Sequence, residues 1–214
     1  MPRGREKTVP RIKVCGITDA AFAVEAARRG VDYLGLIFAA GSPRRVTPEQ
    51  AREIVSAARG VRFVGVFVEQ DVVEIARIAK SVPIDVVQLH CDHDAGKIAA
   101  LKAAGYEVWQ LYDPSGMPPS SGPVADAVLL DGRKGTQHGG TGIRADWSQV
   151  AVLKRAGHRV VLAGGLSAAN VAAAAATGAD VLDINSTLEI APGQKSIRLL
   201  DEILASMPRE IMVK

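Results

Sequence analysis

The sequence predicts a single (β/α)8 barrel, and three observations carry that prediction. Eight short apolar runs recur along the 214 residues, and segments of helical period separate most of them. Continuous apolar runs of this kind are typical of parallel strands buried on both faces. The chain is also 48% hydrophobic and only 4% aromatic, and its length suits one substantial core. A doubly wound sheet is disfavoured, because it seldom needs eight strands in so short a chain and the G-x-G-x-x-G that usually follows its first strand is missing here.

The strands and helices follow from the same pattern. The predicted strands are residues 12–15, 32–38, 61–68, 85–90, 106–112, 126–131, 159–164 and 179–184. Predicted helices cover residues 47–58, 72–80, 94–104, 146–156 and 168–176, several with Ser, Thr or Asp at the start and Gly near the end. Segment 113–125 is rich in proline and glycine, so we expect the helix after the fifth strand to be short or missing.

Composition sets limits on the class of function. We expect residues 1–10 to form a disordered or loosely ordered tail ahead of one barrel domain, 11–214. The formal charge of +3 is spread along the chain, with no basic stripe interleaved with aromatics, which argues against nucleic-acid binding. The longest apolar runs have the length of strands, so no membrane span is predicted. Two cysteines without a signal-peptide pattern predict free thiols in the cytoplasm.

Two reactive side chains close predicted strands. Cys15 ends the first strand and Asp131 the sixth. Functional residues of barrels gather at such ends, so these side chains are expected to face each other across the barrel mouth as a base and an acid. Structural interpretations stay open: a lone cysteine after an apolar strand is most often a small buried hydrophobe, and a partner could satisfy the Asp131 carboxylate.

Polar side chains follow two further strands. Arg44 and Arg45 stand in the loop after the second strand, where one of them could hold a substrate carboxylate with its planar fork and the other is an ordinary loop charge. His90 ends the fourth strand. The HCDHD run, 90–94, has no second cluster of Cys or His to complete a metal site, so His90 is predicted to face a ligand and no metal is predicted.

Glycines after late strands indicate a phosphate site. Gly164 and Gly165 follow the seventh strand directly, and INSTLE follows the eighth. The loops after these two strands commonly bind phosphate in barrels, through backbone amides. The glycine-rich stretch 133–147, which includes Gly140, is typical of a lid or of backbone that a ligand approaches closely. The predicted ligand is therefore a small phosphorylated molecule.

An ordered set of motifs between residues 11 and 204 resembles the phosphoribosylanthranilate isomerase family. The motifs are KVCGIT (13–18), SPRRVTPEQA (42–51), VGVFV (64–68), VQLH (87–90), LLD (129–131), GGTG with a following DW (139–147), LAGGL with NV (162–171) and PGQK (192–195). The resemblance implies a (β/α)8 isomerase of tryptophan biosynthesis that needs neither metal nor cofactor. Its implied reaction is the Amadori rearrangement of N-(5-phosphoribosyl)anthranilate to 1-(2-carboxyphenylamino)-1-deoxyribulose 5-phosphate.

The resemblance also implies residue roles. Asp131 would protonate the ring oxygen and Cys15 would remove the proton from C2, for which the thiol pKa is expected to fall toward neutrality. Arg44 would hold the anthranilate carboxylate. The remaining implied substrate contacts are His90, Gly140, Gly164, Gly165, Asp183, Asn185, Ser186 and Thr187.

Several positions depart from the family pattern. Cys91 replaces a glycine, and the family's usual DVSSGVE is DINSTLE here, so that Asn185 replaces a serine and Thr187 a glycine. A β-branched Thr187 is expected to tighten or reshape the phosphate contacts. Two alternatives therefore stay open: a paralogous sugar-phosphate isomerase of secondary metabolism, and a non-catalytic barrel that binds a phosphate ligand. The sequence is compatible with a monomer or a homodimer.

Overall fold

The computed structural model describes residues 10–90, 95–112, 125–132 and 145–208. Predictions that fall elsewhere lie outside the described residues. They concern the tail before Pro10, Cys91, nearly all of the segment between the fifth and sixth strands, and Gly140.

Eight parallel strands close into a barrel in sequence order, with the last strand pairing with the first. The predicted (β/α)8 fold is confirmed. The strands are β1 (Arg11–Cys15), β2 (Tyr33–Ile37), β3 (Arg62–Phe67), β4 (Val86–Leu89), β5 (Glu107–Leu111), β6 (Ala127–Leu130), β7 (Val160–Leu162) and β8 (Val181–Ile184).

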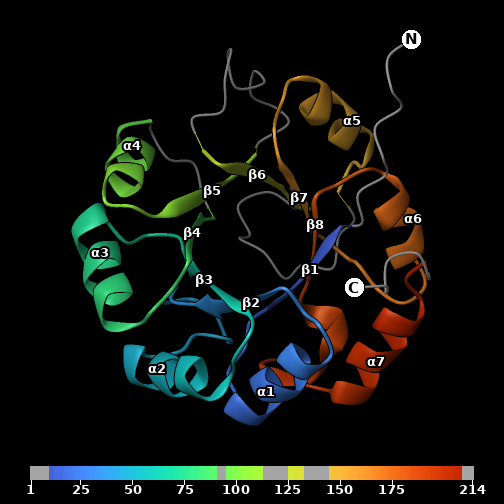
Figure 1. The fold of residues 1–214 in the computed structure, drawn as a ribbon, viewed down its shortest axis with the longest axis horizontal. Coiled ribbons are helices and arrows are strands. Elements are labelled where there is room, and N and C mark those ends of the chain that lie inside the picture. Colours follow the sequence, from blue (N-terminus) through green and yellow to red (C-terminus); the bar gives the residue numbers. More distant parts are fainter. Residues whose placement is uncertain (1–9, 91–94, 113–124, 133–144, 209–214) are drawn as a thin grey trace.

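Helices form a ring around the barrel, as the view along its axis shows (Figure 1). In the described residues they are α1 (Ala20–Arg28), α2 (Pro48–Ala57), α3 (Val72–Ser81), α4 (Ala95–Ala103), α5 (Ser148–Arg155), α6 (Val171–Ala176) and α7 (Ile197–Ala205).

Side chains cap the starts of four described helices, of which α2 and α3 are helices that the sequence predicts. Asp19, Asp71 and Ser196 each accept a backbone N–H from the first turn of α1, α3 and α7. Thr47 and Gln50 form a reciprocal capping box at α2, where Pro48 takes the first helical position. These caps orient each helix as it leaves the loop that follows a strand, and those loops build the mouth of the barrel.

The helix predicted over 168–176 begins later than expected, at Val171. The Asn170 side chain explains the difference, because it accepts the Ser167 N–H and donates to the Gly165 carbonyl. Asn170 thereby holds the preceding residues in a turn rather than in a helix.

The connection after β8 contains structure that the sequence does not predict. A short 3-10 helix, η1 (Ser186–Leu188), leads into an antiparallel hairpin of β9 (Glu189–Ala191) and β10 (Gln194–Lys195). Gly193 adopts a φ of +79° in its turn, a conformation that glycine adopts without steric cost. The hairpin lies between the end of β8 and α7 in sequence, so it adds its side chains to the mouth of the barrel.

Alternation along the strands separates two apolar layers. Ile12 and Val14 of β1 belong to the layer between sheet and helices, whereas Cys15 belongs to the interior of the barrel with Tyr33 and Trp109. Side chains two apart share a face of a strand, so Lys13 also points into the interior.

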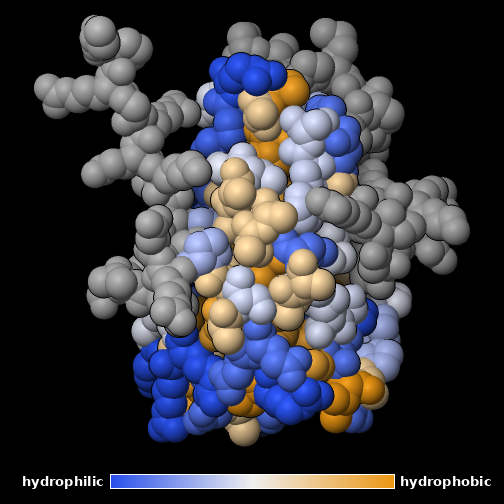
Figure 2. All heavy atoms as spheres, turned by 90° about the vertical axis from the view of Figure 1, so that its right-hand side faces the viewer, coloured by the Kyte–Doolittle hydropathy of each residue, from blue (hydrophilic) through white to orange (hydrophobic). Residues whose placement is uncertain are grey.

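The outer surface of the barrel carries mixed polarity. On the face that includes α6 and α7, hydrophilic side chains gather at the lower end and hydrophobic atoms are exposed in small patches (Figure 2). Exposed Arg198, Asp201 and Glu202 of α7 contribute charge. Among the helices that the structure describes, none has the length and hydropathy to cross a membrane.

Candidate active site

A cavity of about 570 Å³ opens at the carboxyl ends of the strands. Its size is in the range of small-molecule sites. Every predicted site residue that the structure describes lines it, and Gly140 lies outside the described residues. The cavity is lined by Cys15, Ser42, Arg44, Glu69, Gln88, His90, Asp131, Gly164, Gly165, Leu166, Asp183, Asn185, Ser186 and Thr187, together with apolar and small residues.

Cys15 reaches the cavity because two glycines leave room around it. A Cβ on Gly35, its neighbour on β2, would lie 2.7 Å from Sγ. Gly16 has a φ of +74°, and a Cβ there would lie 2.8 Å from Arg44 Cδ and 2.9 Å from Asn185 Oδ1. The Cys-Gly sequence therefore turns the chain tightly from β1 toward α1 beneath these two side chains.

Burial raises the pKa of the Cys15 thiol. The Lys13 ammonium opposes this effect, the Asp183 carboxylate adds to it, and Lys195 opposes it again. The expectation that the thiol pKa falls toward neutrality is therefore wrong for this structure, because the loss of solvation outweighs the two lysines. The charges around the thiol thus decide how much thiolate is available.

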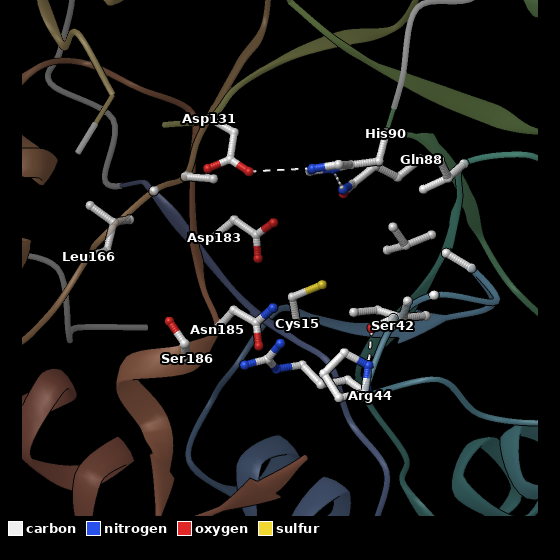
Figure 3. A pocket seen from close by; sticks show the side chains of 18 of the residues that line it. Cys15, Ser42, Arg44, Gln88, His90, Asp131, Leu166, Asp183, Asn185 and Ser186 are labelled. Atoms are coloured by element: carbon white, nitrogen blue, oxygen red, sulfur yellow. Dashed lines mark hydrogen bonds and ion pairs between the residues drawn. The ribbon is translucent and has the colours of Figure 1, made fainter. Parts of the chain in front are cut away.

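Asp131, directly after β6, has a partner across the barrel mouth. His90 Nε2 lies 3.4 Å from Asp131 Oδ2, and Gln88 Nε2 lies 3.2 Å from His90 Nδ1 (Figure 3). With the Gln88 amide as the donor, Nδ1 accepts and the Nε2–H of His90 faces the carboxylate. Gln88 and His90 are two residues apart at the end of β4, so the strand period places both in the interior. Gln88 is a site residue that the sequence analysis missed.

Arg44, rather than Arg45, lines the cavity, whereas Arg45 is exposed. The Arg44 guanidinium holds Glu189 through two hydrogen bonds, Nε to Oε1 at 2.8 Å and Nη2 to Oε2 at 2.7 Å. A guanidinium has five N–H donors, so three remain for a ligand carboxylate. Glu189 thus fixes the orientation of Arg44.

A buried network ties the hairpin to the end of β8. Lys195 Nζ donates to the Asn185 carbonyl, to Asn185 Oδ1 at 2.9 Å and to Glu189 Oε1 at 2.8 Å. The Lys195 and Glu189 side chains are only 2% and 5% exposed. Burial lowers the pKa of Lys195, with Glu189 opposing that effect. Neither residue is predicted as a site residue from the sequence, because their contacts depend on the hairpin of β9 and β10.

A second buried ion pair lies among the interior side chains. Lys13 Nζ donates to Asp183 Oδ2 at 2.5 Å, and the two side chains are 0% and 6% exposed. The parallel register of β1 and β8 places the two residues beside each other. Burial works to lower the pKa of Lys13, but the Asp183 carboxylate and the Cys15 thiol outweigh it and raise that pKa. Lys13 is therefore a buried cation.

The part of the cavity formed by the loops after β7 and β8 consists mainly of backbone. Gly164 and Gly165 have φ values of +86° and +62°, which glycine adopts without steric cost. Because glycine has no side chain, nothing on these residues shields their amides. Thr187 Oγ1 donates to the Leu166 carbonyl at 2.5 Å and so joins η1 to the loop after β7. Ser186 also lines the cavity here.

In the described residues, no group of three or more His, Cys, Asp and Glu side chains is placed to hold a metal ion. Residues 91–94 of the HCDHD run lie outside that part of the chain. The site therefore consists of a thiol, a carboxyl with its histidine, an arginine and a backbone cradle.

Comparison with known protein families gives one consistent match. The family model for N-(5′-phosphoribosyl)anthranilate (PRA) isomerase matches residues 12–206. The N-(5′-phosphoribosyl)anthranilate isomerase of Pelobacter propionicus is 35% identical over 196 residues, which cover 91% of this chain and 93% of that protein. The tryptophan biosynthesis protein TrpCF of Vibrio cholerae is 39% identical over 199 residues, but the chain spans only 41% of its length.

Solved structures agree with the sequence comparison. Phosphoribosyl anthranilate isomerase from Thermus thermophilus has a TM-score of 0.83 and 34% identity, with 92% of this chain and 97% of that chain covered. A phosphoribosyl anthranilate isomerase in complex with reduced 1-(o-carboxyphenylamino)-1-deoxyribulose 5-phosphate has a TM-score of 0.77 and 27% identity, over 92% and 97% of the two chains.

Proposed function

The chain belongs to the N-(5′-phosphoribosyl)anthranilate isomerase family and isomerises N-(5′-phosphoribosyl)anthranilate in tryptophan biosynthesis, and from this premise we propose that Cys15 and Asp131 are its general base and general acid. The observation that carries the proposal is that the thiol and the carboxyl enter one cavity from β1 and from the residue after β6 (Figure 3). Two further strands, β8 and β7, separate them in the closed barrel. They therefore reach different atoms of one sugar.

The proposed reaction needs one proton donor and one acceptor. Asp131 protonates the furanose oxygen, and the ring opens to an iminium ion between C1 and the anthranilate nitrogen. The Cys15 thiolate takes the proton from C2, and the C–H electron pair forms the enamine. Tautomerisation of the enamine to the ketone completes the Amadori rearrangement without a net change in protons or electrons, so the side chains supply all of the acid–base chemistry.

Orientation of the substrate follows from its two anionic ends. We assign the anthranilate carboxylate to the free N–H groups of Arg44, whose guanidinium Glu189 holds in place. The phosphate belongs to the backbone around Gly164, Gly165, Ser186 and Thr187, and His90, Asp183 and Asn185 face the sugar between the two ends. Holding both ends places C2 and the ring oxygen at the base and the acid. Gly140 stays a predicted substrate contact. The cytoplasmic location and the oligomeric state, monomer or homodimer, also stay predictions.

The test compares the enzyme with two single substitutions in an assay that follows the loss of substrate fluorescence. Cys15→Ser and Asp131→Asn are each expected to reduce kcat by about 100-fold to 10,000-fold, since each removes one proton-transfer group. Asp201→Asn, an exposed aspartate on α7, is the matched control and is expected to keep the wild-type rate. Wild-type rates in both active-site variants would contradict the assigned roles, and an uncatalysed rate in the wild type would contradict the proposed chemistry altogether.

A further inference from the structure

Lys13 is a buried charge to which the proposed chemistry gives no part. Its side chain is fully buried in the barrel interior and is paired with Asp183 Oδ2 at 2.5 Å. Taking an ammonium ion out of water costs several kcal/mol, which a single ion pair seldom recovers in full. An apolar side chain would fill the same space in an interior that consists mainly of aliphatic and aromatic residues. The buried ammonium therefore suggests a functional role for Lys13.

The position of Lys13 relates it to the proposed base. Lys13 and Cys15 are two residues apart on β1, so the strand period points both side chains into the interior, with Lys13 one layer below the cavity. The Lys13 ammonium is paired with the Asp183 carboxylate, and its charge acts on the Cys15 thiol to lower the thiol pKa. An ammonium group has three donors, so its pairing with Asp183 uses only part of its donor capacity.

Asp183 supports the same arrangement. Its Oδ2 atom binds Lys13, whereas its Oδ1 atom is buried and has no hydrogen-bond partner in the described part of the chain. The carboxylate lines the cavity, but Lys13 does not. Asp183 thus holds the ammonium from the side, on the neighbouring strand, and fixes it beneath the thiol.

Other charged groups face the thiol from different elements. Lys195 of β10 acts on it in the same direction as Lys13, and Asp183 of β8 acts in the opposite direction. Arg44, from the loop after β2, also interacts with it. Glu189 already engages Lys195 and Arg44 with 2.7–2.8 Å contacts. Lys13 is the cation that shares a strand face with the thiol.

We propose that Lys13 is a positioning residue that stabilises the Cys15 thiolate, so that a larger fraction of the base is ionised when the substrate binds than burial alone would allow. This inference rests on the proposed role of Cys15. Lys13 stays protonated throughout, and it transfers no proton. The thiolate takes the C2 proton and becomes a thiol, and the positive charge of the iminium ion is neutralised in the enamine. Lys13 acts only on the form of Cys15 that starts this step.

The experiment measures the ionisation of Cys15 without using the substrate. In a Cys91→Ser background, which leaves Cys15 as the only thiol, the rate of alkylation by iodoacetamide is measured against pH. Lys13→Gln keeps a donor for Asp183 but removes the charge. We expect the thiol pKa to rise by about one unit or more, with about tenfold less thiolate at neutral pH. The kcat should fall in proportion, and KM should change little.

A second variant gives a result of opposite sign. Asp183→Asn removes the negative charge beside the thiol and leaves the Lys13 charge unneutralised, so it should lower the thiol pKa. If Lys13→Gln does not fold, as judged by near-UV circular dichroism, the Asp183→Asn variant still tests the proposal. An unchanged thiol pKa in the folded Lys13→Gln protein, or an unchanged or higher one in Asp183→Asn, would overturn the proposal. Because alkylation does not depend on turnover, these results stay separate from a failure of the isomerase assay.

Discussion

Thr187 is one of two cavity-wall residues, with Asn185, at which this chain departs from its family pattern. Its hydroxyl joins η1 to the Leu166 carbonyl, so the two loops proposed to hold the phosphate are linked by a side chain. Glycine at this position has no hydroxyl to make such a link. This hydrogen bond is the means by which Thr187 is expected to tighten the phosphate contacts, and that effect stays a prediction.

Replacing Thr187 with valine removes the hydroxyl and keeps the shape. The loss of one neutral hydrogen bond corresponds to about 0.5–1.5 kcal/mol, so we expect KM for the substrate to rise about 2-fold to 13-fold while kcat changes little. Steady-state kinetics measure the effect. Thr177→Val is the matched control, because the Thr177 hydroxyl also donates to a backbone carbonyl, that of Ala174, but at the end of α6 and away from the cavity. An equal change of KM in both variants would show that Thr187 has no special part in binding.

At the level of the elements, most of the fold could be predicted from the sequence. Parallel strands buried on both faces need continuous apolar runs, and capped helices need polar residues at fixed positions, so both leave local signals. The strand ends then indicated Cys15, His90 and Asp131, which do line one cavity. The role of Gly35 also depends on the pairing of elements, because Gly35 lies beside Cys15 only in the observed register of β1 and β2.

The residues that were missed depend on contacts between distant segments. Lys13 stands in an apolar strand and could be taken for a surface charge, since its partner Asp183 follows 170 residues later. One local signal existed, because Lys13 and Cys15 are two residues apart, as are Gln88 and His90. Lys195 gave no such signal. Its burial results from a hairpin with strands of two and three residues, which are too short to show a period.

For the molecule as a whole, a charged network closes the end of the barrel opposite to the cavity. Arg11 and Arg159 both donate to the Tyr33 hydroxyl at 2.8 Å. Glu107 accepts from Arg159 at 2.6 Å, from the Trp109 indole at 2.7 Å and from Arg62 at 2.9 Å. These residues lie at or near the start of β1, β2, β3, β5 and β7. The network therefore joins strands from around the barrel. It contributes to stability at this end, away from the proposed chemistry at the other end.

The charge of Glu107 makes this contribution dependent on pH. Burial works to raise the pKa of Glu107, but the Trp109 indole, Arg62 and Arg159 outweigh it and lower that pKa. A lowered pKa means that the stabilisation is present above the unfolded-state pKa of about 4.3 and is lost as the pH falls through the folded-state value. We expect Glu107→Gln to lower the free energy of unfolding by about 1–3 kcal/mol at neutral pH, with kcat and KM unchanged.

Urea unfolding at several pH values measures this difference. The gap between wild type and Glu107→Gln should shrink as the pH falls below about 4.3. Glu53→Gln, a substitution of an exposed glutamate on α2, is the control and should leave the unfolding free energy unchanged at neutral pH. A gap that stays constant down to acidic pH would show that packing rather than charge is responsible.

The proposed chemistry requires above all that Cys15 and Asp131 flank one sugar in a common cavity. A crystal structure of this chain with reduced 1-(o-carboxyphenylamino)-1-deoxyribulose 5-phosphate, the compound bound to one structural relative, measures this directly. We expect the Cys15 sulfur about 3–3.5 Å from C2 and the Asp131 carboxyl at a similar distance from the oxygen on C4, which closes the furanose ring in the substrate. A ligand that lies beyond the reach of either side chain, or that presents the same atom to both, would contradict the assignment.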